Sequence, residues 1–172
     1  NPTTVLTREQ AAKIISYLLL GTTNAEKLGN NTQIFTDVAA GRWSAGYIAY
    51  CANLGIIAGY GNGTFGPEDQ LTGVAFAKML LVALGYDAET EGYVNNTSWA
   101  TNIAVDAIDA GIDITGVVLA EPLTREQAAQ MAFNTLKATL VEYTTTSNTI
   151  TVNGAVIGIG GAAATPVTTT VA

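Results

Sequence analysis

Two arginines stand in the first turn of predicted helices, and each is followed directly by a glutamate. Arg8-Glu9 and Arg125-Glu126 both come after a Leu-Thr pair, and threonine is a preferred residue at the position that precedes a helix. A guanidinium there would add a planar, permanently charged donor to the positive end of a helix dipole. Such a pair can hold one carboxylate without a broadly basic surface. The pattern therefore predicts anion binding at these helix starts.

The residue types that common catalytic and metal sites need are scarce. The chain contains no histidine, which removes the usual general base and the commonest zinc ligand. Adjacent acids such as Glu68-Asp69 lack the arrangement diagnostic of glycoside hydrolysis, and no calcium-loop pattern is present. The single cysteine, Cys51, excludes an intramolecular disulfide and lies in an apolar run. We therefore predict no catalytic residue, no metal site, no cofactor and no enzymatic activity.

Composition narrows the range of partners. The 172 residues are 48% hydrophobic, enough for one globular domain with an appendage. A formal net charge of −7 with only seven Lys plus Arg argues against binding nucleic acid or an anionic membrane by bulk electrostatics. No run of about 18 apolar residues predicts a membrane span, and no signal-peptide pattern opens the chain. If the protein is exported, we expect this chain to be its mature form or an excised part.

An internal repeat organises the sequence. Leu6–Ala12 recurs unchanged as Leu123–Ala129, and Leu71–Ala77 is a degenerate third copy in which glycine and valine replace arginine and glutamate. Trp43 precedes a Gly-Ile pair by the same spacing as Trp99. Apolar periodicity and capping residues predict five helices, with glycines 59, 61 and 63 in a tight reversal after the second. These helices are expected over Arg8 to about Leu20, Tyr47–Leu54, Gly73–Leu84, from Trp99, and over Arg125–Tyr143.

The last stretch of the chain changes character near Thr144. Thr149–Val152 and Val156–Ile159, joined through Asn153-Gly154, are typical of a β-hairpin. Residues 160–172 are rich in glycine, alanine and threonine and are typical of a linker. We therefore expect a helical domain over residues 1–143 and a hairpin with a linker over residues 144–172.

The segment from Phe35 to Leu84 resembles the S-layer homology (SLH) repeat. That pattern runs F-x-D-V, a tryptophan at the start of a first helix, G-I-I-x-G, G-x-F-x-P, and L-T at the start of a second helix. About a dozen positions match in order, which is far more specific than a lone glycine motif. They are Phe35, Asp37, Val38, Trp43, Gly55, Ile56, Ile57, Gly59, Gly63, Phe65, Pro67, Leu71 and Thr72.

The resemblance implies a mainly α-helical, pseudo-threefold bundle with grooves between neighbouring repeats. The Leu-Thr helices would crowd one axis, and the C-terminal hairpin and linker would follow. Residues 1–33 would be an incomplete first repeat, 34–86 the second and 87–143 the third. Since the first repeat lacks its front half, either the chain is trimmed or the domain completes itself differently.

SLH domains hold proteins to the cell envelope, so the resemblance implies an extracellular, noncatalytic anchor. Its partner would be a secondary cell-wall polysaccharide, acidic and typically pyruvylated, or a modified peptidoglycan. A pyruvate ketal presents a carboxylate, and an aromatic ring can cover the apolar face of a sugar. The middle copy, with Gly73 in place of arginine, is expected to have lost its cation. The candidate ligand-binding residues are Arg8, Arg125, Glu9, Glu126, Asp37, Trp43, Trp99, Asn62 and Gly63.

Other interpretations fit the same residues. The arginines could form salt bridges or solvated helix ends, the tryptophans could anchor the core, and Asn62-Gly63 could simply make a turn. A protein that keeps the fold could serve self-association in a surface lattice or filament without binding a glycan. A third reading is that the segment anchors an enzyme whose catalytic part lies elsewhere.

Overall fold

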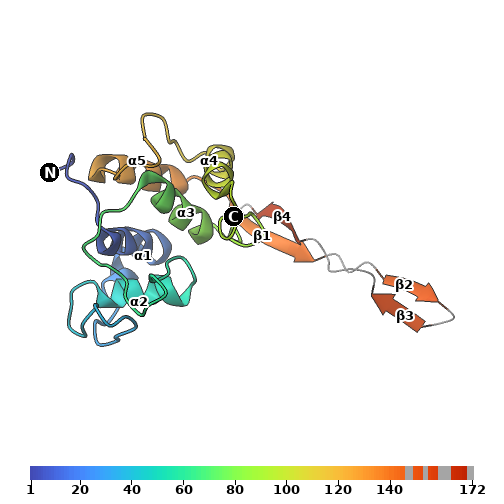
Figure 1. Cartoon of the computed structure of the whole chain (residues 1–172), viewed down its shortest axis with the longest axis horizontal. Helices are drawn as coiled ribbons and strands as arrows, with labels where there is room; N and C mark the ends of the chain where they lie inside the picture. Colours follow the sequence, from blue (N-terminus) through green and yellow to red (C-terminus); the bar gives the residue numbers. More distant parts are fainter. Residues whose placement is uncertain (146–148, 153–154, 159–163, 170–172) are drawn as a thin grey trace.

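Five helices are the main secondary structure of the part of the chain that the computed structural model describes, which is residues 1–145, 149–152, 155–158 and 164–169. Figure 1 shows three of them, α1, α3 and α5, beside one another, with α2 against α1 and α4 against α3. The expected mainly helical class is therefore confirmed. The helices are α1 (Arg8–Ala25), α2 (Ala45–Asn53), α3 (Gly73–Ala83), α4 (Trp99–Asp109) and α5 (Arg125–Thr135).

Three buried leucines join the starts of α1, α3 and α5 in a cycle of backbone hydrogen bonds. Leu6 N–H donates to Leu123 O at 2.8 Å, Leu123 N–H to Leu71 O at 2.8 Å, and Leu71 N–H to Leu6 O at 3.0 Å. Each bond pairs two extended segments that would otherwise present unpaired backbone groups inside the protein. The three helices consequently leave from one point, and each contacts the other two.

The first two amides of each of these helices are also occupied by the backbone. Arg8 N–H and Glu9 N–H donate to Asp69 O and Pro67 O, both at 3.0 Å. A helix normally leaves its first four N–H groups without partners inside the helix, which is why helix starts attract anions. The expectation that these amides help to bind an anion is therefore wrong, because carbonyls of the neighbouring segment already accept their hydrogen bonds. The same pattern recurs for Gly73 and Val74 with Glu121 and Leu119, and for Arg125 and Glu126 with Thr4 and Pro2.

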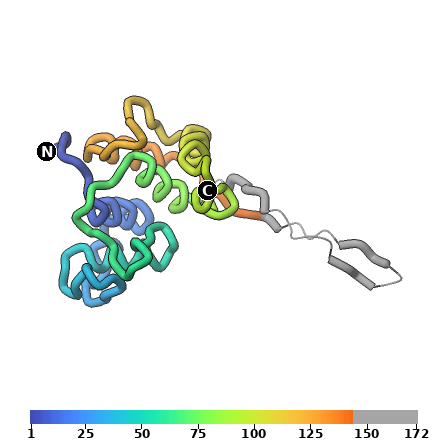
Figure 2. The backbone as a smooth tube through the Cα atoms, in the orientation of Figure 1, coloured from blue at the N-terminus to red at the C-terminus, as the bar shows by residue number. Residues whose placement is uncertain are grey.

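Threonine side chains cap two of these three helix starts, those of α3 and α5. Thr72 Oγ1 accepts from Ala75 N–H, and Thr124 Oγ1 accepts from Gln127 N–H, as expected of threonines at this position. Figure 2 shows the N-terminal residues reaching the start of α5, where Thr4 and Pro2 accept hydrogen bonds. Residues 2–4 thus supply to α5 the carbonyls that residues 67–69 supply to α1.

One hydrophobic core fills the space between the helices. Each of α1, α3, α4 and α5 contributes fully buried side chains, and burial of each large one stabilises the fold by roughly 1.5–3 kcal/mol. Gly21, at a φ of 70°, breaks the regular geometry of α1 near Leu20, where the sequence predicts its end. The large core side chains include Ile15, Phe65, Phe76, Leu80, Leu81, Ile103, Ile112 and Met131.

The prediction of a long last helix is wrong. Helix α5 ends at Thr135, and Leu140–Thr145 instead forms strand β1, which pairs antiparallel with β4 (Ala164–Thr169). Threonine, valine and tyrosine after position 138 favour an extended chain. Val141 N–H also donates to Leu84 O at 2.8 Å, which holds the start of β1 against the end of α3.

Two further segments bear on the predictions for the C-terminal part. Strands β2 (Thr149–Val152) and β3 (Ala155–Gly158) pair antiparallel over the segment where the sequence predicts a hairpin. The expected Asn153-Gly154 connection and Ile159 lie outside the described residues. Residues 164–169 form β4 and are not a linker. The domain boundary near residue 144 stays a prediction, and β1 runs across it.

The close approach of Gly85 to β1 gives a test of this packing. Gly85 has a φ of 105°, and a Cβ there would overlap the carbonyl oxygen of Val141. We expect Gly85→Ala to lower the free energy of unfolding by about 2–4 kcal/mol, because both backbone strain and overlap oppose it. Gly55, at a φ of 71° with open space around its Cβ position, is the control. Gly55→Ala should cost only about 1–2 kcal/mol in urea unfolding; equal losses would contradict the close approach.

Candidate functional site

A groove of about 600 Å³ opens between α1 and the start of α5. Its floor is apolar, and its rim carries two cations and an exposed tryptophan ring. Helix α1 supplies most of the lining, α5 supplies an arginine from its first turn, and the segment before α2 supplies the tryptophan. The lining residues are Leu6, Gln10, Lys13, Ile14, Tyr17, Trp43 and Arg125.

Neither cation of this groove has a carboxylate partner in the described part of the chain. Among the residues that the structure describes, neither Lys13 nor Arg125 forms an ion pair. Lys13 Nζ instead lies 5.3–5.8 Å from the centres of the Tyr17, Tyr47 and Trp43 rings. Arg125 Nε donates to Gln10 Oε1 at 3.3 Å, a neutral acceptor. In a chain with a net charge of −7, this groove therefore brings together two cations that form no ion pair with an acid among the described residues.

Arg8 is placed differently from Arg125. Its Nε donates to Phe65 O and its Nη2 to Ala58 O, both at 2.8 Å. The guanidinium carbon also lies 4.4 Å from the Phe65 ring centre and 4.8 Å from that of Tyr60. Arg8 is therefore committed to holding the glycine-rich reversal, although it too has no carboxylate partner among the described residues.

A second lysine, at the equivalent position of α3, has different surroundings from Lys13. Lys78 follows Leu71 by the same spacing that separates Lys13 from Leu6. Its Nζ donates to Tyr93 O at 3.4 Å, and burial lowers its pKa below the ordinary value. The copy centred on α3 thus has Lys78 and Arg8 at the positions of Lys13 and Arg125, but backbone carbonyls hold both.

Asp37 shapes the reversal instead of facing a groove. Its carboxylate accepts from Phe65 N–H at 2.8 Å and from Gly66 N–H at 2.7 Å. Partial desolvation raises the pKa of Asp37, but these two amides outweigh it and hold the pKa below its ordinary value. Asn62 Oδ1 accepts from Thr64 N–H, and Gly63 O accepts from Thr36 N–H, so both stabilise the turn. None of Asp37, Asn62 and Gly63 lines the groove of Lys13 and Arg125.

The two glutamates have unlike surroundings. Glu9 is only 6% exposed, and Arg42 and Ser44 occupy its carboxylate. Glu126 is exposed and lies with Arg125 and Pro2 along a shallower hollow at the start of α5. Only Glu126 of the two is placed to meet a ligand.

The tryptophans are both on the surface, so neither is a core anchor. Trp43 is 48% exposed and lies in the groove, whereas Trp99 is 40% exposed at the start of α4 and does not line this groove. The middle copy is covered by the chain itself, since a Cβ on Gly73 would meet Val117 Cγ1 at 2.7 Å. The structure therefore brings Arg125 and Trp43 to one groove, which none of the other predicted residues lines.

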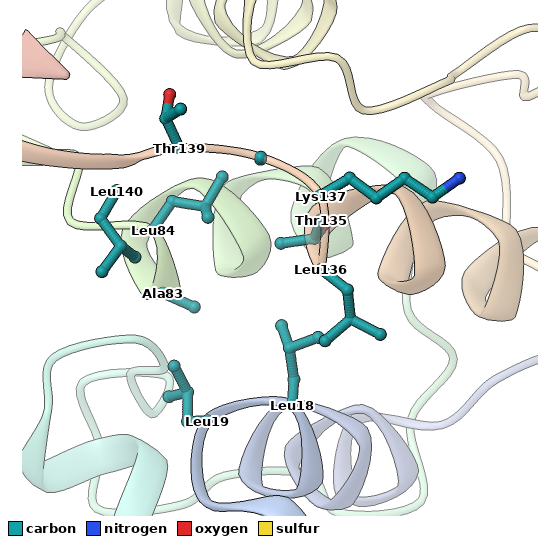
Figure 3. Close-up of a pocket in the computed structure, with 10 residues that line it drawn as sticks. Leu18, Leu19, Ala83, Leu84, Thr135, Leu136, Lys137, Thr139 and Leu140 are labelled. Atoms are coloured by element: carbon teal, nitrogen blue, oxygen red, sulfur yellow. The ribbon is translucent and has the colours of Figure 1, made fainter. Parts of the chain in front are cut away.

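A second hollow lies at the opposite ends of the same helices and is apolar. Figure 3 shows leucines from α1, α3 and the segment after α5 around it, with Lys137 extending away. Lys137 Nζ lies 4.2 Å from the Phe133 ring centre. No acidic or basic group points into this hollow to recognise a charged sugar. In the described part of the chain, no helix is long and apolar enough to cross a bilayer.

Sequence reasoning missed Lys13, Arg42 and Ser44. Lys13 carried a usable signal, because Lys78 repeats its position after a Leu-Thr pair. Arg42 and Ser44 flank Trp43 but are separated from Glu9 by more than 30 positions, so no local pattern connects them. Their roles emerge only from the fold.

The contacts of Asp37 predict a pH-dependent stability. Its folded pKa lies below the reference value of 3.8, so its contribution is complete above that pH and is lost as the pH falls through the folded pKa. Asp37→Asn should lower the free energy of unfolding by about 1 kcal/mol at neutral pH, since an amide cannot accept both bonds in the same way. The difference from the wild type should shrink below about pH 4, as measured by urea unfolding across pH. Asp109→Asn is the control, and an equal loss there would contradict the assignment.

One family model and two curated proteins match parts of this chain. Residues 34–77 match the model of the S-layer homology domain, within the predicted second repeat. The chain is 25% identical over 122 residues to the "Middle cell wall protein" of Brevibacillus brevis strain 47, which covers 71% of this chain and 11% of that protein. It is 28% identical over 92 residues to a "Surface layer protein" of Brevibacillus choshinensis, covering 54% and 8%. The chain therefore spans about a tenth of the length of these curated relatives.

Proposed function

Since the chain carries an S-layer homology domain at residues 34–77, we propose that it is a noncatalytic module that anchors a surface protein to the cell envelope. Its ligand is an acidic cell-wall polysaccharide, bound in the groove between α1 and α5. One observation carries this proposal: Lys13 and Arg125, without carboxylate partners among the described residues, open on the same groove as the exposed ring of Trp43.

The three side chains suit an acidic sugar for different reasons. The guanidinium of Arg125 offers two parallel donors that match a carboxylate, such as that of a pyruvate ketal. Lys13 adds a compact charge whose direction is set by the rings around it. Trp43 presents an apolar face to the hydrocarbon side of a sugar ring. Because the helix amides are already bonded, these side chains supply the recognition.

The proposal extends to the arrangement of the repeats. The cycle of Leu6, Leu71 and Leu123 and the repeated capping pattern support a pseudo-threefold bundle. In that arrangement the three grooves differ in state: one is open, one has its cations tied to carbonyls, and one is covered by the segment around Val117. A single groove would then carry most of the affinity. The names of the two relatives support a place at the cell surface.

Self-association is the second candidate, and exposed apolar side chains favour it. Val105, Ile108 and Val118, on α4 and the segment after it, are 50%, 62% and 64% exposed. Exposed apolar side chains that gather in a patch are a common feature of surfaces that bind other proteins. This candidate predicts sedimentation as oligomers without wall polymer, whereas the anchoring proposal predicts binding by a monomer.

The groove proposal is tested with a double variant. Lys13→Gln with Arg125→Gln should weaken binding to purified acidic wall polymer at least about tenfold, because two charge-assisted contacts are lost. Lys27→Gln with Lys137→Gln removes the same charge from exposed positions outside the groove and is the matched control. Isothermal titration would measure both, against polymer with its acidic groups intact and removed.

The outcomes separate the candidates. Wild-type binding that disappears when the acidic groups are removed supports the proposal, and it should also weaken with added salt. Equal losses in the groove variant and the control would reduce the effect to bulk charge. No binding by the wild type, together with sedimentation as oligomers, would favour self-association.

A further inference from the structure

The residues on both sides of Trp43 bind one and the same carboxylate. Arg42 forms a two-point ion pair with Glu9, Nε to Oε2 at 2.8 Å and Nη2 to Oε1 at 3.1 Å. Ser44 Oγ donates to Glu9 Oε2 at 2.6 Å. Because residues 42 and 44 both reach the first turn of α1, the backbone of Trp43 between them is held from two sides.

This contact set is partly buried and involves charged partners. Glu9 is 6% exposed and Ser44 is fully buried, while the Arg42 side chain is 26% exposed. Two parallel hydrogen bonds between a guanidinium and a carboxylate fix both distance and angle, which a hydrophobic contact does not. Arg42 Nη2 also reaches Glu68 at 2.7 Å, on the segment that supplies carbonyls to the start of α1.

The same carboxylate connects the two sides of the groove. Glu9 belongs to α1, which carries Lys13 one turn further on, and Arg42 and Ser44 belong to the segment that carries Trp43. Lys13 Nζ lies 5.8 Å from the Trp43 ring centre. The ion pair therefore sets the distance between a cation and an aromatic ring that face the same groove.

The start of α3 and the segment around Trp99 show that helices of this fold form without this arrangement. At the positions of Glu9, Arg42 and Ser44 they have Val74, Ser98 and Ala100. Val74 is buried and Ala100 packs against the core, so apolar residues stand at two positions of the charged set. Replacement of a buried ion pair by apolar residues is often neutral or stabilising, so stability alone does not explain why Glu9 and Arg42 are present.

We propose that Glu9, Arg42 and Ser44 are positioning residues that hold Trp43 in the orientation in which its ring covers the sugar. This inference rests on the proposed function of the groove for its consequence in binding. It assigns Glu9, a residue predicted to touch the ligand, a role exerted through Arg42 and Ser44. The orientation of the ring itself is measurable without any ligand.

The test places valine, serine and alanine, the residues found at positions 74, 98 and 100, at the positions of Glu9, Arg42 and Ser44. In a Trp99→Phe background, where Trp43 is the remaining tryptophan, Glu9→Val, Arg42→Ser and Ser44→Ala are combined. We expect helical circular dichroism to be retained, because α3 and α4 form with these same three residues. Acrylamide quenching of Trp43 should rise about twofold, its fluorescence anisotropy should decay faster, and affinity for the acidic wall polymer should fall about tenfold. Glu68→Gln, which removes only the exposed ion pair of Arg42, is the matched control. It should leave the quenching, the anisotropy decay and the affinity unchanged.

Conservative single variants keep the test decisive if the triple variant fails to fold. Arg42→Lys retains the charge but loses the two-point geometry, and Ser44→Ala removes one hydrogen bond; both should give intermediate quenching and affinity. Unchanged Trp43 fluorescence in a folded triple variant, or in both single variants, would overturn the inference. A mobile ring with unchanged affinity would overturn its role in binding. If the wild type binds no wall polymer, the proposed function fails, while the fluorescence still decides whether Trp43 is held.

Discussion

The hydrogen-bond cycle of Leu6, Leu71 and Leu123 is the constraint on which the rest of the structure depends. It brings three helix starts to one point and supplies each with carbonyls from its neighbour. Two consequences follow. Side chains in the first turns of α1 and α5 are brought close to segments distant in sequence, which creates the groove between them. The first two amides of each helix are bonded in the process, so in the proposed function recognition of an anion falls to arginine and lysine side chains.

Residues at equivalent positions of the repeated sequence make different contacts because their neighbours differ. Lys13 is surrounded by aromatic rings, which attract its ammonium without neutralising it, whereas Lys78 is drawn to a backbone carbonyl. Arg8 faces the glycine-rich reversal, whose carbonyls it binds, while Arg125 donates to the side chain of Gln10. A repeated sequence therefore gives one groove with two available cations and another in which the same two positions serve structure.

The sequence predicted the starts of the helices well because the signals are local. Leu-Thr pairs, the cap formed by Thr72, and Gly55 after α2 each act within a few residues. It did not predict β1, because the apolar spacing before Tyr143 also fits a helix and the deciding contact, Val141 with Leu84, joins distant segments. Nor did it distinguish Arg8 from Arg125, which share identical local sequence. The sequence also did not predict that Glu9 pairs with Arg42, because no local pattern connects residues so far apart in the chain.

The attachment of β1 has a mechanical consequence. Tension applied to the chain beyond residue 145 reaches β1 first, where Val141 is hydrogen-bonded to Leu84 at the end of α3 and fits against Gly85. That load enters at the helix ends opposite the groove, so it acts first on the hydrogen bond between Val141 and Leu84. In the proposed function, the end of the fold that takes the load is therefore separate from the groove that binds the wall.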